Sequence, residues 1–232
     1  VRLTPENGSS LWRTGMPSDD CFRYALTEPA IEDVDSDGGL EVIVSSIEDV
    51  VIAHSAESGT NEWRAPLQLM DTAAPTIANV SSAPGPEVVT SDTRGGVVVV
   101  HRNGSVSWRF SLDETHWSAP SVWQAPTVND FDADGSPEIL AGSSRGPLLL
   151  SANGTVDWQQ NGSGTYTATA QVDDDPAIEV FTAGTSSIRA YDSQTGEREW
   201  QRNLTTLGFE RLLMQMTAQG SIYISVELEG PS

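Results

Sequence analysis

Two short acidic segments, residues 33–41 and 130–138, have the residue types and the spacing to bind a metal ion. Each reads Asp-x-Asp-x-Asp-Gly-x-x-Glu, which puts carboxylates at positions 1, 3, 5 and 9. A hard cation takes about six to eight oxygen ligands. All-oxygen donors, without His or Cys, favour calcium over zinc or copper. The predicted ligands are Asp33, Asp35, Asp37, Gly39 and Glu41 in the first segment and Asp130, Asp132, Asp134, Ser136 and Glu138 in the second.

Both segments differ from an EF-hand, which requires a glutamate at position 12 and flanking helices. Position 12 is Val44 in the first segment and Ala141 in the second, and both lie in strand-like runs. Gly at position 6 permits a sharp turn, and position 7 offers its backbone carbonyl. Acidic turns are common in any Asp-rich chain, but two copies of one pattern at the same place in a repeat favour structural calcium.

Two further copies of this segment have lost predicted ligands. In residues 79–87, Ser81 and Ala83 stand at positions 3 and 5, so no metal site is expected there. Residues 171–179 keep three carboxylates but begin with a glutamine, and Pro176 replaces the glycine. A weak site there is predicted from Asp173, Asp175 and Glu179.

The acidic segments belong to an internal repeat, which indicates the elements that must position them. Five similar phrases each end in tryptophan: RLTPENGSSLW, AHSAESGTNEW, VHRNGSVSW, LSANGTVDW and AYDSQTGEREW. Each has an apolar strand, a polar turn with glycine and a second strand, which is a hairpin pattern. The acidic or degraded segments precede the last four phrases, with their glutamates in register. One unit therefore holds four short antiparallel strands.

A repeat of about 45 residues with four strands per unit predicts an all-β fold, a β-propeller. The complete blades are expected at about residues 25–67, 68–112, 120–160 and 165–204. The fifth is expected to join residues 205–232 with 1–15, so that a split blade closes the ring within a single domain, 1–232, and protects its strand edges. The rival interpretation is an arc of a larger ring of seven or eight blades.

The loop phrase resembles the FG-GAP repeat of integrin-α-like propellers, and residues 190–200 resemble the PQQ-like (quinoprotein-like) propeller repeat. Together they are similar to PQQ-like/FG-GAP propellers of the kind found among surface proteins of extreme halophiles. In the FG-GAP family the loop acids bind calcium, and the resemblance implies that role for both full segments. No PQQ is expected, because quinoprotein dehydrogenases commonly have adjacent cysteines or a lysine near the quinone, and this chain has one Cys and no Lys.

The charge of the chain excludes some classes of partner. It contains 33 Asp and Glu against 12 cations, all arginine, for a formal net charge of -21. Such a polyanion repels nucleic acid. Calcium-rich extracellular proteins and proteins adapted to high salt both have this character, and the absence of lysine favours the second. No apolar run is long enough to span a membrane.

Two other sets of residues are candidates for surface roles. Six Asn-x-Ser/Thr sequons are predicted glycan acceptors, at Asn7, Asn79, Asn103, Asn153, Asn161 and Asn203. Trp117 and Trp123 lie off the repeat in an insertion, and loops on a rigid scaffold often carry binding residues. They are the candidate ligand face, although a capping role for the core is the simpler interpretation.

These features predict a non-enzymatic, calcium-binding propeller outside the cell or on its surface. It would act as an adhesion, recognition or scaffold module whose partner is a surface protein or a glycan. One alternative is a polysaccharide-active hydrolase or lyase that uses the funnel of the propeller. Another is an assembly factor that binds strands of a partner by edge addition.

Overall fold

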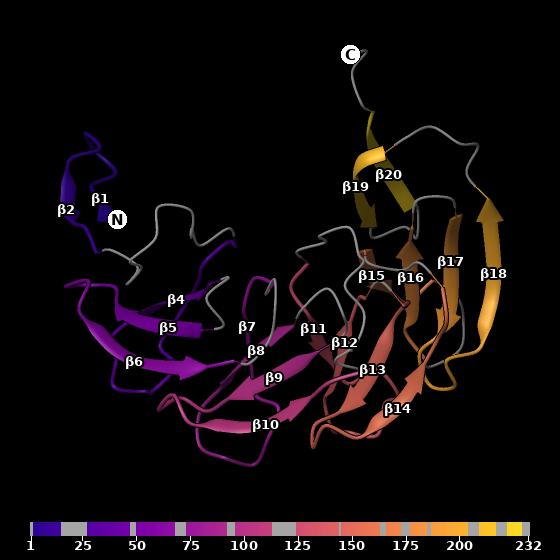
Figure 1. Cartoon of the computed structure of the whole chain (residues 1–232), viewed down its shortest axis with the longest axis horizontal. Helices are drawn as coiled ribbons and strands as arrows, with labels where there is room; N and C mark the ends of the chain where they lie inside the picture. The colour runs from indigo at the N-terminus through magenta and orange to yellow at the C-terminus, as the bar shows by residue number, and fades with distance from the viewer. Residues whose placement is uncertain are drawn as a thin grey trace.

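In the computed structural model, antiparallel sheets follow one another along an open arc (Figure 1). The structure describes residues 2–14, 27–46, 50–67, 73–91, 96–112, 124–143, 145–162, 166–172, 177–184 and 187–203, and the backbone of 209–216 and 222–228. In this part of the chain every helix or strand element is a strand. No helix there has the length and apolar character that a membrane crossing requires.

Four of the sheets are complete blades of four strands, in which each strand pairs antiparallel with the next in sequence. The first blade holds β3 (Ala30–Glu32), β4 (Glu41–Ser46), β5 (Val50–Ser55) and β6 (Asn61–Pro66). The second holds β7 (Thr76–Ala78), β8 (Glu87–Ser91), β9 (Val97–Val100) and β10 (Val106–Phe110). The third holds β11 (Thr127–Asn129), β12 (Glu138–Ala141), β13 (Leu148–Ser151) and β14 (Val156–Gln159). The fourth holds β15 (Tyr166–Ala170), β16 (Glu179–Ala183), β17 (Ser187–Asp192) and β18 (Arg198–Asn203). The prediction of an all-β propeller with four-stranded antiparallel blades is confirmed.

Two further hairpins lie at the two ends of the arc (Figure 1). The first pairs β1 (Arg2–Leu3) with β2 (Ser10–Trp12), and the last pairs β19 (Phe209–Met216) with β20 (Ile222–Leu228). Each is a separate two-stranded sheet, so the split blade that would close the ring is not assembled in this structure. Four complete blades and two half-blades together make five, and closure of the ring stays a prediction.

The strands of a blade differ in burial according to their place in it. The third strand of the second blade reads Val-Val-Val-Val, and all four residues, Val97–Val100, are buried. A continuous apolar run suits a strand that is covered on both faces by other sheets. The fourth strand, β10, alternates between half-buried and exposed residues because it lies at the outside of its blade.

The hydrophobic core lies between successive blades and is therefore divided into several clusters. One cluster joins Ile43 and Val51 of the first blade to Val88 and Val98 of the second. A similar cluster joins the second blade to the third, and another joins the third to the fourth. Each blade is consequently stabilised by contact with its neighbours, as in other repeat architectures.

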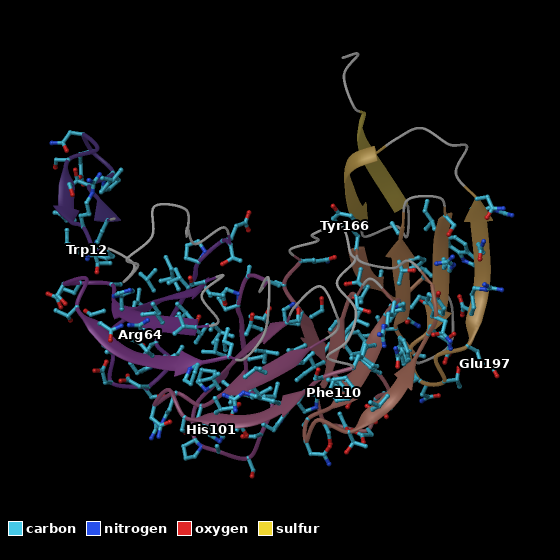
Figure 2. All side chains as sticks on the ribbon, in the orientation of Figure 1. Trp12, Arg64, His101, Phe110, Tyr166 and Glu197 are labelled. Atoms are coloured by element: carbon cyan, nitrogen blue, oxygen red, sulfur yellow. The ribbon has the colours of Figure 1, made fainter. Side chains whose placement is uncertain are left out.

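The repeat tryptophans form a regular contact between blades. The outer turn, which joins the third and fourth strands, contains a glycine with positive φ, and a Cβ added there would meet the tryptophan of the preceding unit. The pairs are Trp12 with Gly59, Trp63 with Gly104, Trp108 with Gly154 and Trp158 with Gly196, at 2.6 to 2.9 Å from the added Cβ. These four tryptophans therefore lie between successive units, and Trp12 is labelled in Figure 2.

Candidate metal centre

The two full acidic segments, here the first loop (33–41) and the third loop (130–138), join the first two strands of their blades with the same backbone. Ser36 and Ala133 stand at the fourth position with φ of 65° and 60°, and Gly38 and Gly135 at the sixth with 93° and 91°. A left-handed conformation is unfavourable for residues other than glycine. The fold therefore builds the same strained turn twice.

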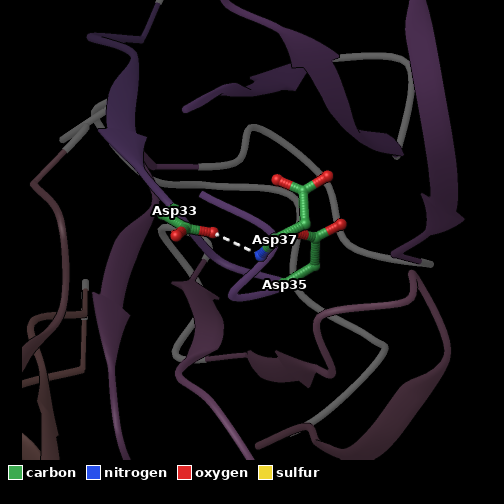
Figure 3. A group of neighbouring side chains, drawn as sticks. All are labelled: Asp33, Asp35 and Asp37. Carbon is green, nitrogen blue, oxygen red and sulfur yellow. Dashed lines mark hydrogen bonds between the residues drawn. The ribbon is translucent and has the colours of Figure 1, made fainter. Parts of the chain in front are cut away.

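In the first loop, backbone amides bind the acidic side chains (Figure 3). Asp33 Oδ1 accepts a hydrogen bond from the amide of Asp37 at 3.1 Å, and its Oδ2 accepts one from Gly38 at 3.0 Å. Asp37 Oδ1 accepts one from the amide of Gly39 at 2.7 Å. Carboxylate oxygens of Asp33, Asp35 and Asp37 lie within 4.8 Å of one another. That spacing allows one cation to contact all three.

The third loop repeats this hydrogen-bond pattern. Asp130 Oδ2 accepts from the amide of Gly135 at 3.1 Å, and Asp134 Oδ1 accepts from Ser136 at 2.7 Å. The three carboxylates within 4.8 Å are those of Asp130, Asp132 and Glu138. Asp130 Oδ1 is buried and has no hydrogen-bond partner among the described residues. An orphaned carboxylate oxygen beside two other carboxylates fits a hard cation, whose charge would satisfy it.

The predicted ligand sets are thus only partly brought together. Glu41 is not in the group of three in the first loop, and Asp134 is not in the group in the third. At position 7, the amides of Gly39 and Ser136 bind the position-5 carboxylates, while metal contact by their carbonyls stays a prediction. Metal binding by the remaining ligands also stays a prediction.

The glutamate at position 9 has a second role in all four complete blades. Its Oε2 accepts a hydrogen bond from the backbone amide seven residues earlier, at 2.7 to 3.0 Å. The four glutamates, all buried, are Glu41, Glu87, Glu138 and Glu179. We call this hydrogen bond, from a backbone amide to the position-9 glutamate, the brace. Sequence reasoning missed it, although the glutamate is present even in the loop that has lost its other acids.

Burial and crowding raise the pKa of carboxyls at both loops. The pKa of Glu138 rises to about 7, chiefly because the side chain is buried, while the hydrogen bond from Phe131 opposes the shift and nearby Asp132 adds to it. Burial likewise raises the pKa of Glu41. Charged carboxylates are thus disfavoured here without a compensating cation.

The fourth strand of each blade that carries a full loop adds another acid. Glu62 in β6 is largely exposed, but partial desolvation raises its pKa, and the charges of Asp35 and Asp37 add to the rise. Partial desolvation also raises the pKa of the exposed Asp157 in β14, while a hydrogen bond with Ser151 opposes the shift and the charges of the third loop add to it. Both residues immediately precede a repeat tryptophan. The negative potential therefore extends beyond the loops.

The following blade supports each full loop through a side-chain donor from its outer turn. Arg102 Nη1 donates to the carbonyl of Asp35 at 2.9 Å, and Gln194 Nε2 donates to the carbonyl of Asp132 at 3.0 Å. Arg102 and Gln194 each lie two residues before the positive-φ glycine of their outer turn, where the blade after the degraded second loop has Ala152. These donors fix the loop backbone across a blade boundary. Sequence analysis missed them because a hairpin turn gives no sign of what lies across the boundary.

A shallow depression of about 600 Å³ lies beside the first loop at the boundary between the first and second blades. Its lining residues are Asp35, Asp37, Glu62, Trp63, Arg102 and Asn103. Three acids of six lining residues make it suited to a cation or a cationic group.

The second loop (79–87) keeps the brace without the acids. Ser81 Oγ donates to Glu87 Oε1 and accepts a hydrogen bond from the amide of Ala83 at 3.0 Å. His101 Nδ1 lies 3.6 Å from the same carboxylate. Ser81 therefore replaces the position-3 aspartate in the turn, and the polar partners of Glu87 take the place that carboxylates have in the full loops.

The structure describes only some of the other predicted site residues. Asp173, Asp175, Trp117 and Trp123 lie outside the described residues. Glu179 is described and makes the brace to Val172. All six sequon asparagines are exposed, and Asn7, Asn103 and Asn153 each accept a hydrogen bond from the amide two residues on. Their glycosylation stays a prediction.

A family model described as outer membrane protein assembly factor BamB (PQQ_2) matches residues 69–219, well over half of the chain. This match confirms the PQQ-like propeller resemblance. Among curated proteins, none matches the sequence.

Three solved structures illustrate what the chain is similar to. Saccharomyces cerevisiae Sqt1 superimposes with a TM-score of 0.67 at 12% identity, over 98% of this chain and 62% of that one. BBS1N, in a complex with ARL6DN, gives 0.51 at 11% identity, over 90% of this chain and 80% of that one. The quinohemoprotein alcohol dehydrogenase of Comamonas testosteroni gives 0.49 at 16% identity, over 74% of this chain and 35% of that one. The chain thus spans about a third of the dehydrogenase and less than two thirds of Sqt1. At these identities the two matches with TM-scores above 0.5 establish the fold alone.

Proposed function

We propose that this chain, which belongs to the BamB-like PQQ_2 family of β-propellers, is a non-enzymatic protein-binding scaffold stabilised by calcium. Membership of this family supports the scaffold role, because the family description names an assembly factor. The whole protein's partners are part of the proposal. Propellers offer rigid faces on which loops are held in fixed positions, which suits recognition.

The calcium assignment depends on one observation above all. The Asp-x-Asp-x-Asp-Gly-x-x-Glu spacing occurs twice at the same place in the repeat, with the same left-handed backbone at positions 4 and 6. All donors are oxygens, and one of them, Asp130 Oδ1, is buried without a partner. Calcium there would neutralise the clustered acids and join the first strand of a blade to its second. Binding would therefore add directly to the free energy of unfolding.

We place the protein outside the cell or on its surface, in a high-salt environment. The net charge of -21 without any lysine supports this location, since dense carboxylates are tolerated where salt screens their repulsion. Six exposed sequons are compatible with export. The scaffold would then serve adhesion or recognition of a surface protein or a glycan.

A second candidate function is assembly of partner proteins through strand addition. The family description favours it, and among the described strands β6, β10 and β14 each pair with one strand only, at the outside of their blades. An extended partner segment could add to such an edge through backbone hydrogen bonds. The first candidate predicts calcium-dependent binding at loops, whereas the second predicts binding that tolerates loop substitutions.

Calorimetric titration of the chelator-treated chain with calcium tests the metal assignment. We expect two sites, and a rise in the thermal midpoint of on the order of 10 °C at saturating calcium, since each site at 100-fold its Kd adds about 2.7 kcal/mol. The variant D130N/D132N should lose one site, while S81A in the second loop should keep both. Magnesium is titrated in parallel as the control cation. If calcium produces neither heat nor a shift in the thermal midpoint, the calcium assignment is wrong.

Partner capture tests the scaffold role separately. The immobilised chain is exposed to surface-protein fractions and to a glycan array at molar salt, with and without calcium. Specific binding that is lost in D33N/D35N or D130N/D132N supports recognition at the loops. Binding that is unchanged in both variants but blocked by an extended peptide competitor supports strand addition instead.

A further inference from the structure

The two full loops carry the same number of acids but meet different charges across the blade boundary. Each has four carboxylates of its own and one more in the fourth strand of its blade, Glu62 for the first loop and Asp157 for the third. The outer turn of the following blade places Arg102 on the first loop and Gln194 on the third. Arg102 therefore brings one positive charge to the first loop, and Gln194 brings none to the third.

Arg102 and Gln194 bind the same point of their loops. Nη1 of Arg102 donates to the carbonyl of Asp35 at 2.9 Å, and Nε2 of Gln194 donates to the carbonyl of Asp132 at 3.0 Å. Both acceptors stand at position 3, and the carboxylates of both belong to the groups of three within 4.8 Å. A guanidinium does not lose its charge in proteins. The first loop thus has a permanent cation bound to a residue that is also a predicted metal ligand.

The following blade holds the third loop through one more side chain. Ser193 of its outer turn is fully buried and donates to the carbonyl of Phe131 at 2.7 Å. At the same spacing from the turn glycine, the blade after the first loop has His101, whose Nδ1 lies 3.6 Å from Glu87 of its own blade. Among the described residues of that turn, Arg102 is the one side chain that binds the first loop. A loop that is already fixed in shape loses less entropy on binding.

The tryptophans at these two blade boundaries show the same difference. Trp158 docks on the outer turn of the fourth blade, and its Nε1 donates to the carbonyl of Ser193 at 2.6 Å. Trp63 docks on the outer turn of the second blade, but its Nε1 is buried without a hydrogen-bond partner in the described part of the chain. The turn that carries Arg102 is therefore tied less closely to the blade before it than the turn that carries Gln194.

The two groups of carboxylates differ in how far water reaches them. The group of the third loop includes Glu138, which is 4% exposed, and Asp130, whose Oδ1 is buried. The group of the first loop consists of Asp33, Asp35 and Asp37, of which Asp37 is exposed and the last two line the depression. A cation and carboxylates attract each other more strongly where water is excluded. Burial therefore favours the third loop as the tighter site.

We propose that the third loop binds calcium more tightly than the first, and that the charge of Arg102 lowers the affinity of the first. This inference rests on the calcium role proposed above. One unit charge beside a divalent ion at a half-buried site changes the affinity by on the order of tenfold. The third loop then stays filled as a structural tie, while the first fills and empties as the calcium concentration changes. Since the first loop lines the depression, its filling changes the charge of a surface that a partner can reach.

Calcium titration of two variants measures the two affinities separately. D130N/D132N keeps the acids of the first loop, and D33N/D35N keeps those of the third. The second variant should bind calcium about tenfold more tightly than the first. Equal affinities, or tighter binding by the first loop, overturn this inference and leave the calcium role intact. If neither variant nor the wild-type chain binds calcium, the calcium role itself is wrong.

Exchanging the two donors tests the role of the charge. In the D130N/D132N background, R102Q should tighten calcium binding about five- to tenfold, whereas R102K, which keeps the charge, should not tighten it. In the D33N/D35N background, Q194R should weaken binding by a similar factor. The control is R109Q, which removes an equal charge from the same blade, where Arg109 binds the carbonyls of Pro66 and Leu67. It should change neither affinity.

Salt separates an effect of charge from a loss of loop shape. The gain from R102Q should shrink as sodium chloride is raised from about 0.5 M to about 2 M, because salt screens the guanidinium. Weaker binding by R102Q and R102K alike, at every salt concentration, would show that Arg102 only holds the loop backbone and would overturn its proposed role. If circular dichroism shows that R102Q does not fold, Q194R decides: unchanged binding in that variant contradicts the charge effect.

Discussion

The second and third loops are the same structural element with and without its acids. In both, a buried glutamate, Glu87 or Glu138, accepts a hydrogen bond from the backbone amide seven residues earlier. Around Glu87 the neighbours are a serine hydroxyl and a histidine ring, whereas Glu138 faces the carboxylates of Asp130 and Asp132. The loop can therefore form without clustered negative charge.

The backbone of the two loops differs where the acids differ. The third loop holds Ala133 at a positive φ of 60°, and the second loop has no such non-glycine residue and places its positive φ at Gly85. Strained backbone persists where the surrounding structure and function require it. The Glu–amide hydrogen bond is satisfied in both loops, so the strain and the repulsion of the third loop are additional features, and the proposed cation would offset them.

Replacing a brace glutamate should change the thermal midpoint most. The comparison of Glu87 with Glu138 should separate hydrogen bonding to the backbone amide from the proposed metal binding. In chelator, E87A is expected to lower the thermal midpoint by about 5 °C or more, because a buried amide loses its partner at a cost of about 1–3 kcal/mol. E138A should lower it less, since removal of one acid relieves repulsion in the third loop. In saturating calcium, E138A should lower the midpoint more than E87A does. The measurement is thermal unfolding by circular dichroism, and an unchanged order in calcium would count against a metal role for Glu138.

Removing charge from the third loop while keeping the size of its side chains should raise the thermal midpoint in chelator and lower it in calcium. D130N/D132N is expected to raise the midpoint by a few degrees in chelator, because the buried carboxylates no longer repel each other. In calcium the variant should melt below the wild-type chain by about 5 °C, the share of one site. S81A in the second loop is the control, and its calcium-induced rise should match that of the wild type. Parallel shifts of the wild type and D130N/D132N would contradict the assignment.

The pKa of Glu138 gives a pH dependence that calcium should remove. Its pKa is raised from 4.5 to about 7 in the folded chain, so between these values the folded state binds more protons than the unfolded state. The contribution of this group is fully present below about pH 4.5 and is lost as the pH rises to about 7. In chelator, melts from pH 5 to 7.5 should show this decline, and E138Q should flatten it. Calcium, which favours the charged carboxylate, should flatten it as well.

The smallest expected effect concerns the strained position of the third loop. A133G should raise the midpoint in chelator by about 2–4 °C, because glycine adopts positive φ at little cost and a strained alanine costs roughly 1 kcal/mol. The matched control is S82G at the same position of the second loop, where φ is not positive and glycine should be neutral or slightly destabilising. Equal shifts in the two loops would indicate that the turn is not strained in solution.

Much of the fold could be predicted from local patterns. The glycine turns, the five tryptophan phrases and the alternation of strands indicated four-stranded units, because hairpin geometry depends on a few neighbouring residues. The spacing of Asp33, Asp35 and Asp37 likewise indicated that their carboxylates converge. The sequence also placed a glutamate in register in four units. It did not show that each glutamate binds a backbone amide, because position 9 is equally suited to a ligand and to a brace.

The sequence by itself thus determined the elements, the repeat and the acids at each loop, since these follow from contacts within one unit. Only the tertiary structure decided what crosses from one unit to the next. The donation of Arg102 and Gln194 to the loop carbonyls, and the docking of Trp12 on the Gly59 turn, join residues more than forty positions apart. Such contacts depend on the angle between blades, which the packing of several side chains fixes together. At one end of the arc this packing is missing among the described residues, so a Cβ at Gly8 would contact nothing and Leu3 is exposed.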